Sequence, residues 1–304
     1  LLHLDGLLTT FTTISLLALA LSLDGYKNPR SAAFIRVPFI LTAASGAAAG
    51  CAILTKSAGL ILLPFVGLFF LTAVFLWRLP WTSLMGTGMT WLVALAGGQL
   101  VLLPALWTAP VATYQTIIGT IFHETEEVLP AIFFLGEVRA APGPAFYPVA
   151  LLFRLNPLAL LGLILGVWYG WRQKWWQRPY FLITVTWPIF FMAVLTIATR
   201  KYDRYLLPAL PLLFLLGVLG WGLFLRQRPS WTRLVTVAGA IALLLYLGTA
   251  VPTLLNAYNP LVGGPFTARY VLPLGWGEAV SAAAQWLAEQ PDAAQKTAVA
   301  GIGP

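Results

Sequence analysis

Two long apolar segments flank a short cluster of charges and constrain most strongly how this chain can fold. The segments are Tyr180–Thr199 and Leu206–Leu225, and between them the chain reads Arg200-Lys201-Tyr202-Asp203-Arg204-Tyr205. A helix needs roughly 20 predominantly apolar residues to cross a bilayer, and each segment is about that long. We therefore expect the hexapeptide at residues 200–205, here called the charged knot, at one surface of a membrane.

The composition excludes a soluble globular protein. Of the 304 residues, 59% are hydrophobic and 9% are charged, whereas soluble domains carry about 25% charged residues. The apolar segments are too long and uniform for the alternating strands of a membrane barrel, which leaves helices as the spanning structure. The sequence therefore predicts an all-α polytopic membrane protein. We explain the net charge of +8 by the retention of basic loops on one side of the membrane and by contacts with lipid headgroups. We therefore expect membrane lipids, but no nucleic acid, as partners.

Eight segments qualify as membrane spans. The fifth is short, and a start near Tyr147 would place Arg154 within its first turns. The predicted spans are Leu7–Leu23, Val37–Thr55, Ala58–Trp77, Leu84–Leu106, Pro157–Trp171, Tyr180–Thr199, Tyr205–Leu225 and Arg233–Val251.

Alternating the loops between two sides of the membrane separates the charges. One side gathers ten of the 18 basic residues with a single acid, Asp24, and the other side takes the remaining eight basic and nine acidic residues. Because basic loops are retained in the cytoplasm, the second side is expected to face outside the cytoplasmic membrane. The ten basic residues are Lys27, Arg30, Arg36, Arg78, Arg172, Lys174, Arg178, Arg226, Arg228 and Arg233.

The outside face is expected to carry a long functional loop. Residues 1–252 form the predicted transmembrane core, and residues 107–156 form its outside loop. The stretches Val111–Phe122 and Phe146–Phe153 within this loop are amphipathic enough to lie along the membrane surface.

The tail, residues 253–304, is more polar and is expected to begin an extracytoplasmic α/β domain. Within it, Ala279–Glu289 has helical spacing and Lys296–Ile302 has the composition of a strand. The chain begins at Leu1 rather than Met and stops within this domain, so we expect it to be an internal piece of a longer protein.

The unusual polar residues of the outside face form the candidate site. A basic residue in an outside turn works against the charge bias and needs a reason of its own. A carboxylate can deprotonate an acceptor, and Lys or Arg can hold a departing phosphate. Nucleotide sugars and ATP are not usual donors outside the membrane, so this pattern favours a lipid-linked phosphate donor. The candidates are Asp5, Lys56, Arg154, Arg200, Lys201, Arg204 and Tyr205.

Each candidate also has a structural interpretation. Asp5 can cap the N-terminus of its helix, and Lys56 can extend to lipid headgroups. Arg154 can anchor its helix at the interface. Asp203 can pair with a neighbouring arginine of the charged knot, which would leave the other cations for headgroups.

A divalent metal is the one cofactor that the sequence suggests. His123 and Glu124 lie beside two further glutamates in the long loop. One histidine among carboxylates can bind a divalent cation, and the alternative is that these side chains are simply solvated.

Several motifs follow one another in an order that resembles a known family. They are Leu1–Phe11 with its acid before a helix, Gly46–Lys56 ending in Leu-Thr-Lys, Phe133-Phe134-Leu135-Gly136, Pro142–Tyr147, Arg204-Tyr205-Leu206-Leu207-Pro208, and Tyr258–Leu261 with Gly275–Glu278. In this order they resemble bacterial GT-C glycosyltransferases, namely the family 39 protein mannosyltransferase-like proteins and their aminoarabinose-transferase relatives.

The resemblance implies a GT-C-type helical bundle and an inverting glycosyltransferase. The donor would be a polyprenyl-phosphate-linked sugar, and the acceptor a protein, lipid or glycan outside the membrane. It implies that Asp5 serves catalysis or acceptor binding, that Lys56, Arg154 and the charged knot contact the donor phosphate, and that the principal carboxylate lies upstream of Leu1. The alternatives are a multi-pass transporter or lipid flippase, which would carry ionisable residues near the bilayer midplane, and a non-catalytic envelope scaffold.

Overall fold

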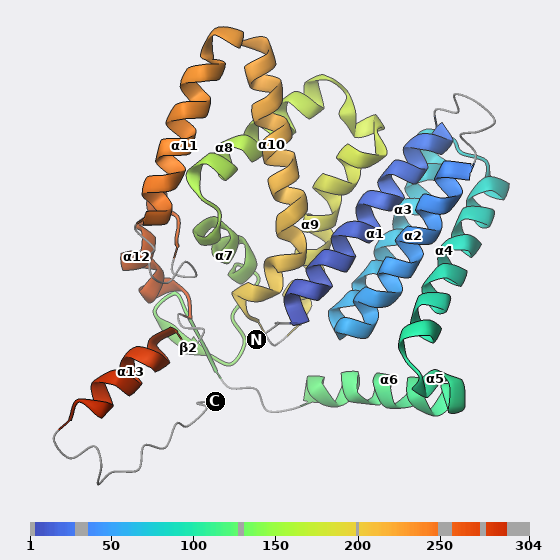
Figure 1. Cartoon of the computed structure of the whole chain (residues 1–304), viewed down its shortest axis with the longest axis horizontal. Coiled ribbons are helices and arrows are strands. Elements are labelled where there is room, and N and C mark those ends of the chain that lie inside the picture. The colour runs from blue at the N-terminus through green and yellow to red at the C-terminus, as the bar shows by residue number, and fades with distance from the viewer. Residues whose placement is uncertain are drawn as a thin grey trace. The chain divides into compact units, whose positions relative to one another are not determined.

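The protein is mostly helical and divides into two compact units. The computed structural model describes residues 4–27, 36–126, 131–198, 201–248, 257–273 and 278–290 (Figure 1). The first unit comprises residues 1–127, 159–198 and 202–228, and the second comprises residues 128–158, 199–201 and 229–304. The predicted domain boundary at residues 252 and 253 lies outside the described residues.

The first unit is built from helices alone among its described residues. Its elements are α1 (Leu4–Lys27), α2 (Arg36–Thr55), η2 (Ser57–Ile61), α3 (Leu62–Trp77), α4 (Trp81–Leu102), α5 (Ala105–Thr108), α6 (Pro110–Glu126), nearly all of α8 (Pro157–Arg172), η3 (Trp175–Gln177), α9 (Pro179–Ile197), η4 (Asp203–Ala209) and α10 (Leu210–Gln227).

The expectation of a polytopic helical membrane protein is confirmed. Among the described residues, seven helices are long and apolar enough to cross a membrane, or up to eight if α7 and α8 together make one bent span. Apolar side chains project from these helices, as Phe75, Val101 and Val218 are 76%, 72% and 68% exposed. Water would disfavour such surfaces, whereas lipid accommodates them.

The fifth predicted span differs from the others. Helix α8 has 16 residues and begins at Pro157, while α7 (Phe146–Arg154) is a separate helix. The two helices meet at a bend of 114°, so a fifth span that starts near Tyr147 would be a broken span, and that alternative stays a prediction. Pro157 lacks the N–H that would continue α7, and it disfavours helical geometry at the preceding Asn156.

Small and hydroxylated residues let α2 pack closely against both α1 and α4, and α2 lies between these two helices in Figure 1. A Cβ atom at Gly46 would overlap the carbonyl oxygen of Trp91, and one at Gly50 would lie 2.5 Å from that of Leu95. Ser45 donates to the Ser15 carbonyl at 2.7 Å and accepts from the Trp91 indole at 3.0 Å. Close backbone approach and interhelical hydrogen bonds are how helices associate in lipid.

Glycines also bring α8 against α10. A Cβ atom at Gly220 would overlap the Gly162 carbonyl oxygen, and one at Gly166 would overlap that of Leu216. At the other end of α8, Gly170 leaves room for the ring of Phe181 in α9. These contacts pack the middle of α8 against the middle of α10 and the C-terminal end of α8 against the start of α9.

The ends of the first unit separate the charges as predicted. Asp24, near the end of α1, pairs with Arg178 before α9 at 3.7 Å. Asp5, at the start of α1, lies instead with Lys56 and Arg204. The helix alternation predicted that Asp24 and Arg178 share one side of the membrane and that the other three share the opposite side.

The second unit contains the β-hairpin and the described part of the tail. Its elements are β1 (Ile132–Phe134), β2 (Glu137–Arg139), α7, η5 (Pro229–Trp231), α11 (Thr232–Gly248), η7 (Pro260–Val262), α12 (Gly264–Val271) and α13 (Glu278–Ala288).

The hairpin was not predicted from the sequence. Strands β1 and β2 pair antiparallel, with Phe133 opposite Val138, and Leu135 and Gly136 form the turn with φ of 54° and 83°. The Leu135 amide donates to the Val271 carbonyl of α12 at 3.0 Å. Helix α13 confirms the predicted helix at Ala279–Glu289, whereas the predicted strand Lys296–Ile302 lies outside the described residues.

The two amphipathic stretches predicted in the long loop are helical. Val111–Phe122 falls within α6, and Phe146–Phe153 falls within α7. In Figure 1, α6 lies crosswise below the lower end of α4. The Tyr114 hydroxyl of α6 donates to the Gln99 side chain of α4 at 2.6 Å.

Candidate functional site

Three distant segments of the first unit bring a carboxylate and two cations together. Asp5 lies in the first turn of α1, Lys56 lies between α2 and η2, and Arg204 lies in η4. The Lys56 ammonium is 2.6 Å from Oδ1 of Asp5, and Nε of Arg204 is 3.9 Å from Oδ2. We call these three residues the ionic cluster.

Local backbone geometry explains why Lys56 reaches this position. Helix α2 ends at Thr55, and Lys56 adopts an extended conformation with φ of −162° and ψ of 146° before η2 begins. A Cβ atom at Gly59 would collide with the backbone of Ala52, so only glycine permits this tight return. The predicted tight turn at Lys56 is therefore confirmed.

Aromatic rings flank the cations of the ionic cluster. The Lys56 ammonium lies 4.4 Å from the centroid of the Tyr205 ring, and the Arg204 guanidinium lies 4.8 Å from that of Tyr202. The two tyrosine rings meet edge to face at 5.4 Å. Cation–π contacts of this kind restrict the rotamers of both cations and hold them without adding negative charge.

Burial divides the roles within the ionic cluster. The Asp5 side chain is 2% exposed, whereas those of Lys56 and Arg204 are 28% and 33% exposed. A buried carboxylate with a cation at each oxygen orients those cations. The cluster thus presents two partly exposed cations and carries a net charge of +1.

The structure brings together four of the predicted site residues, namely Asp5, Lys56, Arg204 and Tyr205. Tyr202 joins them and was not predicted as a site residue, although it belongs to the charged knot. The sequence feature that could have indicated Tyr202 is the pair of tyrosines on either side of the Asp203–Arg204 dipeptide. Asp203 is itself buried, at 7% exposure.

The other members of the charged knot differ from this group. Arg200 lies outside the described residues. Lys201 directly precedes Tyr202 and is buried, and this burial lowers the pKa of its ammonium group below the ordinary value of a lysine. The pKa falls because burial removes water from the ammonium group and so disfavours its charged form.

Arg154 belongs to the second unit. Its guanidinium stacks over the ring of Tyr258 with a centroid distance of 4.4 Å. Asn259 next to this ring donates from its backbone N–H to the Phe153 carbonyl at 2.7 Å and from its side chain to the Leu152 carbonyl at 2.9 Å. The segment Tyr258–Asn259 therefore caps the C-terminal end of α7, and a phosphate-binding role for Arg154 stays a prediction.

The metal prediction also stays open. His123 and Glu124 fall in the last turns of α6, and their side chains lie outside the part that the structure describes. Within the described residues, no group of three His, Cys, Asp or Glu side chains gathers as a metal site would require.

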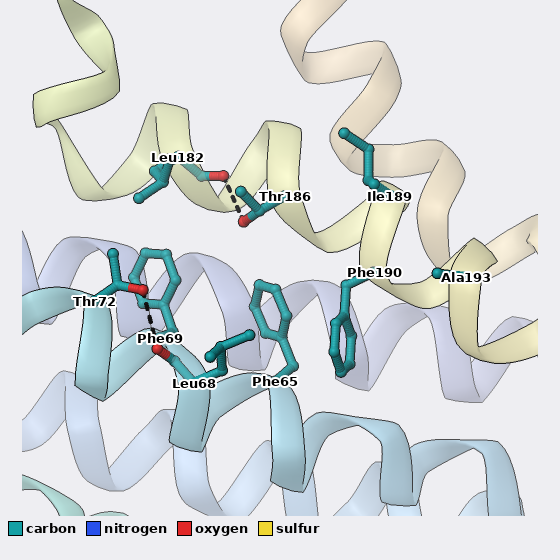
Figure 2. Close-up of a pocket in the computed structure, with 9 residues that line it drawn as sticks. All are labelled: Phe65, Leu68, Phe69, Thr72, Leu182, Thr186, Ile189, Phe190 and Ala193. Carbon is teal, nitrogen blue, oxygen red and sulfur yellow. Dashed lines mark hydrogen bonds between the residues drawn. The ribbon is translucent and has the colours of Figure 1, made fainter.

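An apolar pocket of about 320 Å³ opens between α3 and α9 (Figure 2). The hydroxyls of Thr72 and Thr186 in its walls each donate to a carbonyl of their own helix, Leu68 at 3.0 Å and Leu182 at 2.7 Å. The remaining lining is hydrocarbon and aromatic, and it includes Phe65 and Phe190. The pocket therefore favours an apolar ligand chain.

A chain of contacts links this pocket to the ionic cluster. Phe65 of the pocket packs edge-on against Trp187 with ring centroids 5.0 Å apart. The Trp187 indole then donates to the Pro208 carbonyl at 3.0 Å. Pro208 belongs to η4, the same short helix that carries Arg204 and Tyr205.

Comparison of the chain with protein-family models, curated proteins and solved structures finds no match.

Proposed function

We propose that this protein is a membrane glycosyltransferase that takes its sugar from a polyprenyl-phosphate donor. The observation that carries the proposal is the ionic cluster, in which buried Asp5 holds the partly exposed cations Lys56 and Arg204 at one end of membrane-spanning helices. Two preorganised cations suit the phosphate of such a donor. The apolar pocket between α3 and α9 suits its prenyl chain.

The reaction would increase the negative charge that faces these cations. The acceptor hydroxyl oxygen forms a bond to the anomeric carbon while the bond from that carbon to the phosphate oxygen breaks. The bonding electron pair stays on the phosphate, so a singly charged diester becomes a monoester with one more negative charge. Lys56 and Arg204 would stabilise this increase, which is the differential stabilisation that accelerates a reaction.

The acceptor proton must pass to a base. Within the ionic cluster Asp5 is the one group able to accept it, once the 2.6 Å contact with Lys56 opens. Attack from the side opposite the departing phosphate would invert the anomeric carbon. The proposal includes a site that faces outside the cytoplasmic membrane, a GT-C-type bundle and an α/β domain beginning after residue 252.

The test is turnover of the complete protein, expressed in full from its gene, with labelled polyprenyl-phosphate sugars in detergent. Release or transfer of the label above a heat-inactivated control supports the proposal. Absence of turnover with every lipid-linked sugar tested, together with substrate uptake in proteoliposomes, would replace it with a transporter. The two assays use the same purified protein and so separate the two classes directly.

A further inference from the structure

A second candidate site lies at the opposite end of the first unit from the ionic cluster. An open pocket of about 530 Å³ is lined by Trp171 and Arg172 at the end of α8 and by Lys174 and Trp176 in the following turn. Arg178 at the end of this turn pairs with Asp24 at 3.7 Å, near the C-terminal end of α1. Asp5 occupies the first turn of the same helix, so the proposed transfer site does not use this pocket.

The pocket is preformed by a hydrogen-bonded turn. The Lys174 amide donates to the Trp171 carbonyl at 3.0 Å, and the Gln177 amide donates to the Lys174 carbonyl at 3.1 Å. Lys174 has a left-handed backbone with φ of 55°. Trp175 anchors the turn by packing edge-on against Phe181 of α9, with ring centroids 6.0 Å apart.

The lining combines positive charge with interfacial aromatic rings. Arg172 and Lys174 supply two cations, and the four lining residues include no acid. The Arg172 guanidinium stacks on Trp168 at 4.6 Å, which orients it without neutralising it. Trp171 is 72% exposed. Exposed tryptophans at the ends of apolar helices typically lie at the level of lipid headgroups.

We propose that this pocket binds the phosphodiester headgroup of an anionic phospholipid. Arg172 and Lys174 would make charge-assisted contacts to the phosphate oxygens, and Trp171 and Trp176 would cover the glycerol and the upper acyl chain. Basic side chains at the cytoplasmic end of a membrane helix are attracted to anionic lipid headgroups. The two tryptophans favour a lipid over free phosphate, because free phosphate has no apolar part for them to cover. This site is independent of the proposed glycosyl transfer.

The experiment compares two double variants of the complete protein in mixed micelles of phosphatidylglycerol and phosphatidylcholine. Arg172→Gln with Lys174→Gln removes both pocket cations. Arg226→Gln with Arg228→Gln removes the same charge at the end of α10, on the same predicted side but outside the pocket lining. Bound lipid is counted by mass spectrometry, and thermal unfolding confirms that both variants remain folded.

We expect the pocket variant to lose phosphatidylglycerol affinity about 10- to 30-fold, since each cation near a headgroup contributes about a factor of five. The control variant should stay within about twofold of the parent protein. Trp171→Ala should also weaken phosphatidylglycerol binding, because it removes one of the two rings that cover the glycerol and acyl chain. Equal lipid retention by both double variants, or release of the lipid by millimolar inorganic phosphate, would overturn the proposal.

Discussion

Lys56 crosses from the end of α2 to Asp5 in the first turn of α1, and their charged atoms meet at 2.6 Å across 51 residues of sequence. Arg204 approaches the second oxygen of the same carboxylate from η4 at 3.9 Å. One buried acid thus joins three segments of the first unit. It leaves two cations partly exposed at the end of an apolar bundle, where a lipid phosphate would arrive.

The Asp5–Lys56 pair should contribute measurably to stability. Because Asp5 is buried, removing one partner leaves a polar group poorly compensated, at a cost of about 1 to 3 kcal/mol. A double-mutant cycle with Asp5→Asn and Lys56→Met should therefore give a coupling energy above about 1 kcal/mol. The exposed Arg139–Glu137 pair, at 2.7 Å, is the matched control and should couple by less than that. Equal coupling in both pairs would mean that burial adds nothing.

Gly50 should tolerate no side chain. Its added Cβ would lie 2.5 Å from the Leu95 carbonyl oxygen, whereas a Cβ at Gly97 in α4 meets nothing within 4 Å. Gly50→Ala should cost about 1 to 3 kcal/mol through overpacking. Gly97→Ala should be neutral or slightly stabilising, since alanine favours a helix. Thermal unfolding in detergent measures both, and a similar melting temperature for the two variants would argue against close α2–α4 packing.

The Trp187 indole should hold η4 in place. Trp187→Phe removes its hydrogen bond to the Pro208 carbonyl and should cost about 0.5 to 1.5 kcal/mol. It should also lower transfer activity, because η4 positions Arg204 and Tyr205. Trp107→Phe removes an indole hydrogen bond to the Leu100 carbonyl at an exposed site and should leave activity unchanged. Loss of activity in both variants would point to a general effect of indole removal.

Lys201 should make stability depend on pH. Burial lowers the pKa of Lys201 in the folded protein below its ordinary value of 10.5. Between the lowered pKa and 10.5 the unfolded chain therefore binds more protons, so the free energy of unfolding should rise with pH through this window. Lys201→Met should flatten that rise, whereas Lys174→Met, at an exposed lysine, should preserve it. Identical pH profiles for the two variants would contradict this role of burial.

Much of the ionic cluster could be predicted from the sequence, because alternating helices must deliver every second loop to the same side. That rule alone groups Asp5, Lys56 and Arg204 before any contact is known. It could not supply Trp187, which acts within a membrane span through one hydrogen bond. Nothing in an apolar run distinguishes that indole from its neighbours.

The hairpin was also missed because its local sequence pattern is weak. The hairpin β1–β2 has strands of three residues each, too short for an alternating pattern to stand out. The sequence feature that could have indicated the hairpin is Gly136 in the Leu135-Gly136 turn, because the left-handed backbone there favours glycine. The start of α8 was predictable, because Asn156-Pro157 disfavours a continuous helix and the predicted fifth span begins at Pro157, as α8 does.

The most direct test of the central claim compares the two acids at the ends of α1 in the transfer assay. Asp5→Asn and Lys56→Met disrupt the ionic cluster, whereas Asp24→Asn removes the ion pair with Arg178 at the other end. Turnover of a labelled polyprenyl-phosphate sugar by the complete protein should fall at least about 100-fold in the first two variants. It should stay within about threefold of the parent in Asp24→Asn. Unchanged turnover in folded Asp5→Asn and Lys56→Met would contradict the assignment of the site.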